Sequence, residues 1–132
     1  MVDGRASSNP RWAAITIDCL DPKRVAEFWS HLLGAPVRQI DRPDWYRLGP
    51  FPSGWPAITF QPVPEPKAGK ARIHLDIRVD DLVAAQGLVE SLGGTDREQR
   101  YVYDVGTVAV MADPEGNEFC LVALDPSDDS YP

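Results

Sequence analysis

One stretch in the second half of the chain decides the fold: RIHLDIRVDDLVAAQGLVESLGG, residues 72–94. Apolar and polar residues alternate over its first eight positions, which is the pattern of a β-strand with one buried face. An aspartate, Asp80 or Asp81, then stands where a helix N-cap is expected, and the apolar residues that follow have helical spacing. We therefore predict a strand that leads through an acidic cap into a helix.

The same order of signals is present in the first half of the chain. WAAITIDCL, residues 12–20, is rich in β-favouring residues, and Asp21 and Pro22 then form an N-cap with proline at the first helical position. The helical segment PKRVAEFWSHLLG ends at Gly34, and LLGA at 32–35 reappears as SLGG at 91–94, 59 positions later. An internal repeat of this length predicts two similar modules packed together.

Each helix is followed by three further strand candidates. In the first half they lie near residues 35–40, 44–49 and 56–61, and in the second half near 97–103, 106–112 and 118–124. The turn DPEGN, residues 113–117, joins the last two strands. The chain thus has the order βαβββ twice, with module one at about 12–62, a proline-rich connector, and module two at about 72–124. Residues 1–11 and 125–132 are expected to be flexible tails of this single domain.

Composition excludes several classes of function. The 132 residues are 43% hydrophobic and 25% charged, which is typical of a folded globular protein. The net charge of −7 disfavours nucleic acid and anionic membranes as partners. The opening residues lack the apolar run of a signal peptide, and the two cysteines, Cys19 and Cys120, form no disulfide framework. A cytoplasmic location with reduced thiols is therefore expected.

Three motifs, HLDIRVDDL, LGG and DPEGNEFCLV, resemble the vicinal oxygen chelate superfamily, which includes glyoxalase I, extradiol dioxygenases and bleomycin-resistance proteins. IDCLDPKRVAEFW followed by LLGAPV is most similar to the small glyoxalase-like proteins of bacteria. The resemblance covers about residues 12–124. It implies an α+β fold in which paired βαβββ modules form a curved, incomplete-barrel sheet around a central cavity, commonly in a homodimer.

Metal-dependent members of that superfamily hold their ion with four residues, two from each module. The resemblance carries these positions onto Ala14, onto Gln61 or, with a slip of two residues, Thr59, and onto His74 and Cys120. Alanine offers no ligand atom, and glutamine is a weak neutral ligand. We therefore expect no cofactor, and a divalent metal is disfavoured because a catalytic zinc site needs three good ligands and manganese or iron needs carboxylates.

Strand alternation separates core rows from polar rows without reference to any family. Ile15, Ile17 and Cys19 form one apolar face, whereas His74 and Asp76 stand opposite an apolar row in the fifth strand. If the two sheets curve around one cavity, the polar rows converge on it. The predicted cavity residues are Asp18, Trp45, Arg47, Gln61, His74, Asp76, Arg78, Glu118 and Cys120. Such a set suits a small organic ligand, cationic or aromatic.

His74 is the candidate catalytic residue, and three roles stay open for it: metal ligand, polar group of a binding cavity, or structural histidine. As a general base it would work with Asp76, although side chains at i and i+2 of a strand are about 6–7 Å apart. Cys120 is either a small buried residue or a nucleophile that needs a cationic neighbour.

Two functions of different classes follow. The first is a metal-free small-molecule binding protein of the bleomycin-resistance type, which acts by sequestration. The alternative is a glyoxalase-like lyase, isomerase or dioxygenase that uses His74, but not glyoxalase I proper, because the usual four ligands are missing. A module that acts through a protein partner is a third reading that no residue favours.

Overall fold

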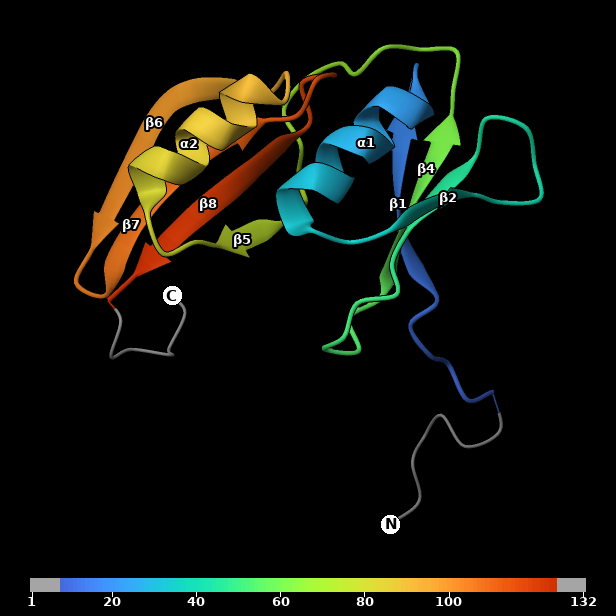
Figure 1. Ribbon diagram of the computed structural model, residues 1–132, viewed down its shortest axis with the longest axis horizontal. Coiled ribbons are helices and arrows are strands. Elements are labelled where there is room, and N and C mark those ends of the chain that lie inside the picture. Colours follow the sequence, from blue (N-terminus) through green and yellow to red (C-terminus); the bar gives the residue numbers. More distant parts are fainter. Residues whose placement is uncertain (1–7, 126–132) are drawn as a thin grey trace.

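The computed structural model describes residues 8–125, and their helices and strands follow the order shown in Figure 1. The first half contains β1 (Ala14–Cys19), α1 (Pro22–Leu33), β2 (Val37–Gln39), β3 (Tyr46–Leu48) and β4 (Ala57–Pro62). The second half contains β5 (Asp76–Arg78), α2 (Leu82–Ser91), β6 (Thr95–Tyr103), β7 (Gly106–Ala112) and β8 (Glu118–Leu124). Both orders are those predicted. Most of each predicted tail lies outside the described residues.

Each half forms a four-stranded sheet, and the two sheets have the same topology. Sheet A has the strand order β1-β4-β3-β2, and sheet B has the order β5-β8-β7-β6. In both sheets the first strand of the module runs parallel to its last, and the other pairs are antiparallel. Within residues 8–125 the two sheets remain separate and close no barrel. The predicted α+β fold of paired βαβββ modules is confirmed.

Local sequence signals begin and end α1 as predicted. The Asp21 side chain accepts a hydrogen bond from the backbone N–H of Arg24 at 3.3 Å, and Pro22 occupies the first turn. Gly34 ends the helix with φ of +65°, a left-handed conformation that favours glycine. In the second module Asp81, rather than Asp80, caps α2, since its side chain accepts from the N–H of Ala84 at 3.0 Å.

Strand β5 is shorter than the eight residues predicted for it. It covers only Asp76–Arg78, and His74 precedes it. In the part of the chain that the structure describes, it pairs only with β8, which begins at Glu118. Before β5, the Glu118 side chain accepts the backbone N–H of Ala71 at 3.2 Å. The prediction that the strand begins at residue 72 was wrong. The alternation of apolar and polar residues shows which side chains face the core, but it does not show where the neighbouring strand ends.

An aromatic cluster joins α1 to sheet B. Figure 1 shows α1 between β8 and the strands of sheet A, and Phe28 and Trp29 on that helix are both buried. The Trp29 ring lies 4.8 Å from that of Phe119 in β8, centroid to centroid, in an edge-on contact. The core therefore runs through both modules. No helix within residues 8–125 is long and apolar enough to cross a membrane.

Candidate functional site

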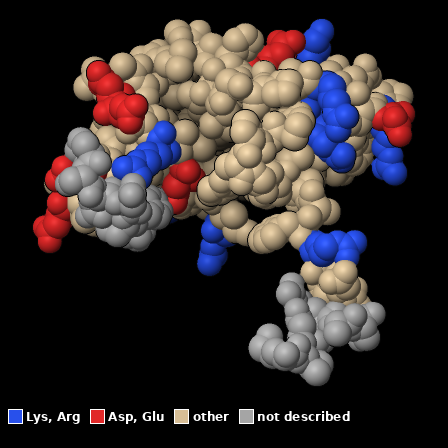
Figure 2. All heavy atoms as spheres, turned by 60° about the horizontal axis from the view of Figure 1, so that its bottom comes forward, with Lys and Arg blue, Asp and Glu red and all other residues tan. Residues whose placement is uncertain are grey.

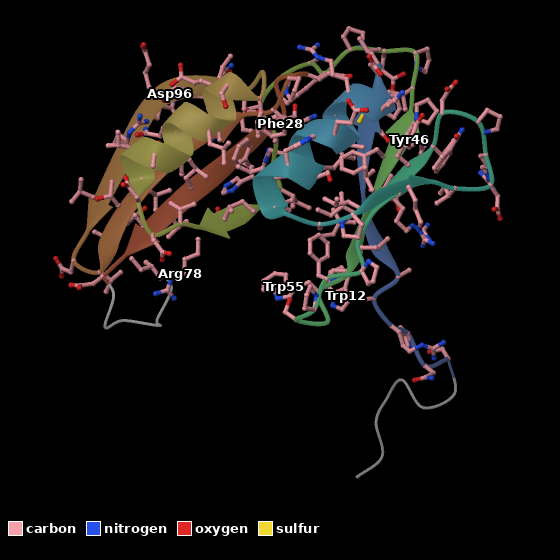
Figure 3. All side chains as sticks on the ribbon, in the orientation of Figure 1. Trp12, Phe28, Tyr46, Trp55, Arg78 and Asp96 are labelled. Atoms are coloured by element: carbon pink, nitrogen blue, oxygen red, sulfur yellow. The ribbon has the colours of Figure 1, made fainter. Side chains whose placement is uncertain are left out.

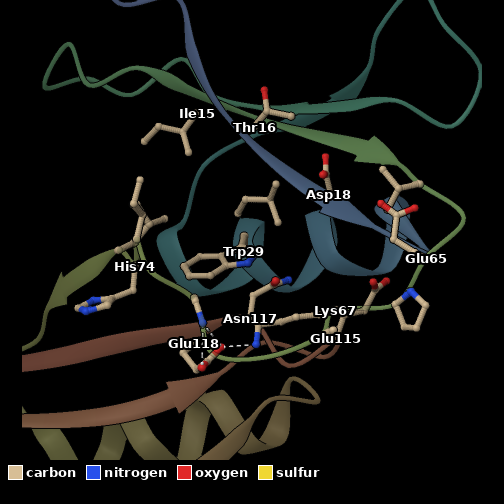
Figure 4. A pocket seen from close by; sticks show the side chains of 17 residues that line it. Ile15, Thr16, Asp18, Trp29, Glu65, Lys67, His74, Glu115, Asn117 and Glu118 are labelled. Carbon is tan, nitrogen blue, oxygen red and sulfur yellow. Dashed lines mark hydrogen bonds and ion pairs between the residues drawn. The ribbon is translucent and has the colours of Figure 1, made fainter.

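A cleft of about 480 Å³ lies between the modules, and we call it the inter-module cleft. Strand β1 forms one wall with Thr16 and Asp18, the connector covers it with Glu65 and Lys67, and Glu118 at the start of β8 lies opposite. Figure 4 shows these side chains around the opening, with Asp18 and Glu65 at the end away from His74.

Glu118, one of the predicted cavity residues, lines this cleft but is held by the connector. Its carboxylate lies 2.7 Å from the Lys67 ammonium and accepts the backbone N–H of Ala71 at 3.2 Å (Figure 4). Burial opposes ionisation of Glu118, but these hydrogen bonds and the charge of Lys67 outweigh it and lower the pKa of its carboxyl. Glu118 therefore fixes the connector against β8. Asp18, by contrast, is exposed.

The DPEGN turn does more than join β7 to β8. Asp113 is buried and accepts hydrogen bonds from the indole N–H of Trp29 at 3.2 Å and from the backbone N–H of Asn117 at 3.0 Å. Glu115 accepts the backbone N–H groups of Leu20 and Asp21, both at 2.7 Å. These carboxylates tie module two to the β1–α1 corner of module one. No local pattern predicts this role, because Leu20 and Trp29 are more than 80 residues away from the turn.

His74, Asp76 and Cys120 form a cluster on module two. The His74 Nδ1 lies 3.2 Å from an Asp76 carboxylate oxygen and 3.9 Å from the Cys120 sulfur. His74 lies before the first residue of β5, and its ring is closer to Asp76 than the separation expected for two strand residues on one face. A carboxylate bonded to imidazole sets the tautomer and orientation of the ring, as in general-base pairs.

Cys120 has the environment of a protonated thiol. It is 6% exposed, and burial together with the nearby negative charge of Asp76 raises its pKa to about 11. A nucleophilic cysteine needs the opposite shift. Burial likewise raises the pKa of Cys19 in the core. These shifts favour the reading of Cys120 as a small buried residue.

A second hollow of about 700 Å³ runs along β5, and we call it the β5 groove. His74, Asp76 and Arg78 line it together with Phe51 and Trp55 from the β3–β4 connection. Figure 3 shows Trp55 and Arg78 on the same side of the molecule, below β5 in that view. His74 borders both this groove and the inter-module cleft. The predicted cavity is thus divided in two around His74.

The remaining predicted residues lie elsewhere. Trp45 and Arg47 line a third hollow, of about 510 Å³, at the β2–β3 end of sheet A. Gln61 and Cys120 line none of the three hollows. Trp55 was missed by sequence reasoning, since FPSGW carries no strand or helix pattern. Its one available signal was a tryptophan in a connection rich in proline and glycine.

Strand register shows which positions of the two modules correspond. Asp76 pairs with Cys120 in sheet B, and Thr16 pairs with Thr59 in sheet A. His74 lies two residues before Asp76, and Ala14 lies two residues before Thr16. Ala14 is therefore the module-one counterpart of His74, and Thr59 is the counterpart of Cys120. Thr59, the second of the two alternatives weighed above, is therefore the corresponding position, and Gln61 lies two residues beyond it.

These residues do not fit a metal site shared by both modules. Ala14 has no donor atom, and the Thr59 hydroxyl accepts a hydrogen bond from the Arg47 guanidinium at 3.3 Å, so a cation already adjoins it. Module two alone offers three ligand atoms, on His74, Asp76 and Cys120, within 4.8 Å of one another. Burial and the negative charge of Asp76 raise the pKa of the thiol among them to about 11.

Comparison with known proteins identifies the family. The family model described as "Glyoxalase-like domain" matches residues 14–122. A search of curated proteins returns no match.

Solved structures share the fold at low identity. A glyoxalase/bleomycin resistance protein/dioxygenase family enzyme from Burkholderia phytofirmans has a TM-score of 0.71 and 19% identity over 86% of this chain and 98% of that one. The fosfomycin resistance protein FosX from Listeria monocytogenes has a TM-score of 0.69 and 13% identity over 89% and 95%. The oxidase ChaP-H2 has a TM-score of 0.65 and 17% identity over 92% and 98%.

Proposed function

The chain belongs to the glyoxalase-like domain family, and on that premise we propose that it is a small-molecule binding protein whose ligand lies in the β5 groove. The observation that carries the proposal is the composition of this groove. Aromatic side chains, Phe51 and Trp55, line it together with Asp76 and His74. Aromatic walls with a few polar groups are typical of ligand sites, and a carboxylate beside an aromatic ring suits a flat or cationic organic molecule.

Trp55 is the principal contact in this proposal. Its side chain is 70% exposed, so apolar surface is available to a ligand at the groove. Among the similar structures are a glyoxalase/bleomycin resistance protein and a fosfomycin resistance protein, which supports a function in handling small molecules. We further propose that the protein acts in the cytoplasm as a homodimer.

Binding of two named probes tests the proposal. Metal-free bleomycin and benzyltrimethylammonium are titrated by calorimetry, with thermal unfolding as a second readout. We expect Trp55→Ala to weaken binding by at least about tenfold, because a buried aromatic contact dominates such interfaces. Trp45→Ala is the matched control and should leave binding unchanged, since Trp45 lines a different hollow. Equal affinities for wild-type protein and Trp55→Ala would contradict the proposed site.

The proposal includes no metal. Its test is the metal content of tag-free protein, followed by calorimetric titration with nickel, zinc, manganese and iron(II). We expect no stoichiometric binding, because Ala14 has no donor atom and the Thr59 hydroxyl is already bonded to the Arg47 guanidinium. Stoichiometric binding that disappears in His74→Ala would show that the module-two cluster holds a metal.

One contact favours a second function, that of a glyoxalase-like lyase, isomerase or dioxygenase. The 3.2 Å contact between His74 and Asp76 gives the imidazole an oriented carboxylate partner, as a general base requires. His74 borders both hollows, so a substrate in either one can reach it. This function predicts that His74→Gln abolishes turnover while the protein stays folded. Retained turnover in that variant would exclude His74 as the base.

A further inference from the structure

The third hollow, at the β2–β3 end of sheet A, is lined by three arginines. Arg38, Arg42 and Arg47 surround it together with Trp45 and one acid, Asp41. Its volume is about 510 Å³, and we call it the arginine pocket. A pocket of this size accepts a small organic molecule.

Two of the arginines are placed directly opposite each other. Arg38 and Arg47 are partners in the antiparallel β2–β3 pair, so their side chains leave the sheet on the same face, with Cβ atoms about 5 Å apart. Like charges in this arrangement destabilise a sheet. An anion between the two guanidinium groups would remove that repulsion.

No carboxylate neutralises these arginines within residues 8–125. The ion pairs there join Lys67 to Glu118, His74 to Asp76 and Arg100 to Asp96. The pocket is lined by three arginines and one aspartate, so positive side chains outnumber negative ones there, although the whole chain has a net charge of −7. Figure 2 shows basic side chains gathered at the right-hand end, the end that carries the β2–β3 connection in Figure 1.

The pocket is held in place by contacts within module one. The Arg47 Nε donates to the hydroxyl of Thr59, which is buried in β4, and this leaves both terminal nitrogens of the guanidinium for a ligand. The Arg42 guanidinium lies 5.1 Å from the centre of the Trp45 ring. The N–H of Ile40 donates to the carbonyl of Trp45 at 3.1 Å and closes the connection. The backbone that carries the three arginines is therefore held by the β2–β3 pairing and by the hydrogen bond between Ile40 and Trp45.

We infer that the arginine pocket is a binding site for a small organic anion, which places a carboxylate or phosphate group between Arg38 and Arg47. The planar guanidinium fork matches both groups with two parallel hydrogen bonds. Trp45 offers apolar contact to the organic part of the ligand. The site differs from the β5 groove proposed above, with which it shares no lining residue.

The experiment titrates two probes, 1-naphthoate and inorganic phosphate, into the full chain at low ionic strength by calorimetry. We expect 1-naphthoate to bind more tightly than phosphate, and Arg38→Ala and Arg47→Ala each to weaken both by at least about tenfold. Arg47→Lys should weaken binding by several-fold, because it keeps the charge but loses the fork.

A matched variant separates the pocket from the overall charge of the protein. Arg97→Ala, in β6 of module two, makes the same change in net charge at an exposed arginine, and it should leave both affinities within about twofold. Equal losses in Arg97→Ala and Arg47→Ala would overturn the inference. Wild-type affinities in the Arg38→Ala/Arg47→Ala double variant would also overturn the inference. If phosphate bound as tightly as 1-naphthoate, the inference that the ligand is organic would be overturned.

Thermal unfolding gives a second and independent readout. Without an anion, Arg38→Ala should unfold at the same temperature as wild type or higher, because the like-charge pair is relieved. With saturating 1-naphthoate, the wild type should unfold at the higher temperature, since a ligand stabilises only the form that binds it. A wild type that is more stable than Arg38→Ala without anion, and gains nothing from the probe, would overturn the inference.

Discussion

Each sheet carries a row of four side chains on the face turned away from its helix, and the two rows occupy equivalent places in the strand register. The row across sheet A consists of Thr16, Thr59, Arg47 and Arg38. The row across sheet B consists of Asp76, Cys120, Val110 and Gln99. One backbone pattern thus presents two unrelated sets of chemical groups.

The rows differ most at their middle positions. Arg47 in β3 corresponds to Val110 in β7, which packs against a small apolar cluster of Val108, Cys120 and Val122. Module one therefore keeps this face polar and basic, whereas module two makes it apolar beside the His74 cluster. The comparison teaches that the repeat determines the backbone, while each module has its own binding chemistry.

The contact that joins the modules should give the largest effect. Asp113→Ala leaves the buried indole N–H of Trp29 without an acceptor and removes the bonds that hold the DPEGN turn. We expect a loss of about 3 kcal/mol in the free energy of unfolding, measured by urea denaturation. Asp104→Ala, at an exposed aspartate in the β6–β7 turn, is the control and should stay within about 0.5 kcal/mol. A loss below about 1 kcal/mol at Asp113 would mean that the modules are held together mainly by apolar packing.

The same new residue at two equivalent positions sharpens the contrast between the rows. Val122 in β8 corresponds to Gln61 in β4, and Val122 is 1% exposed whereas Gln61 is half-buried. Val122→Thr places a hydroxyl in an apolar cluster and should cost about 1.5 kcal/mol in urea unfolding. Gln61→Thr should change stability by less than about 0.5 kcal/mol. Equal effects at the two positions would contradict the difference between the faces.

A smaller effect, with a defined pH dependence, is expected at Glu118, whose counterpart in module one is Ala57. The pKa of Glu118 is lowered in the folded protein, so its contribution to stability is present above the pKa of the unfolded chain and is lost as pH falls through the folded pKa. Glu118→Gln should therefore cost about 1 kcal/mol at pH 7, and the difference from wild type should shrink below about pH 4. Urea midpoints at pH 7, 5 and 3 measure it. A difference that is independent of pH would exclude the ion pair with Lys67 as its cause.

Much of the fold followed from local patterns. The caps at Asp21 and Asp81, the left-handed Gly34 and the alternation in β1 each depend on residues within a few positions of one another. The candidate site followed less well. Asp18, His74 and Glu118 do line one cleft, but Trp45 and Arg47 lie in another hollow, and Arg38 and Arg42 were not recognised. Their signal was present as basic residues on both sides of a hairpin, but only the register pairs Arg38 with Arg47.

The order of elements and the repeat of βαβββ could be predicted from the chain alone, because hydrophobic periodicity and helix caps act over one or two turns of chain. The family could be predicted from three short motifs. The contacts between polar groups came from the three-dimensional structure: Asp113 with Trp29, Glu118 with Lys67, and His74 with Asp76 and Cys120. Most of these partners are distant in sequence. The Asp113–Trp29 contact depends on how the two modules pack across α1. The other contacts depend on the path of the connector and on the pairing of β5 with β8, and no local pattern in the chain specifies either.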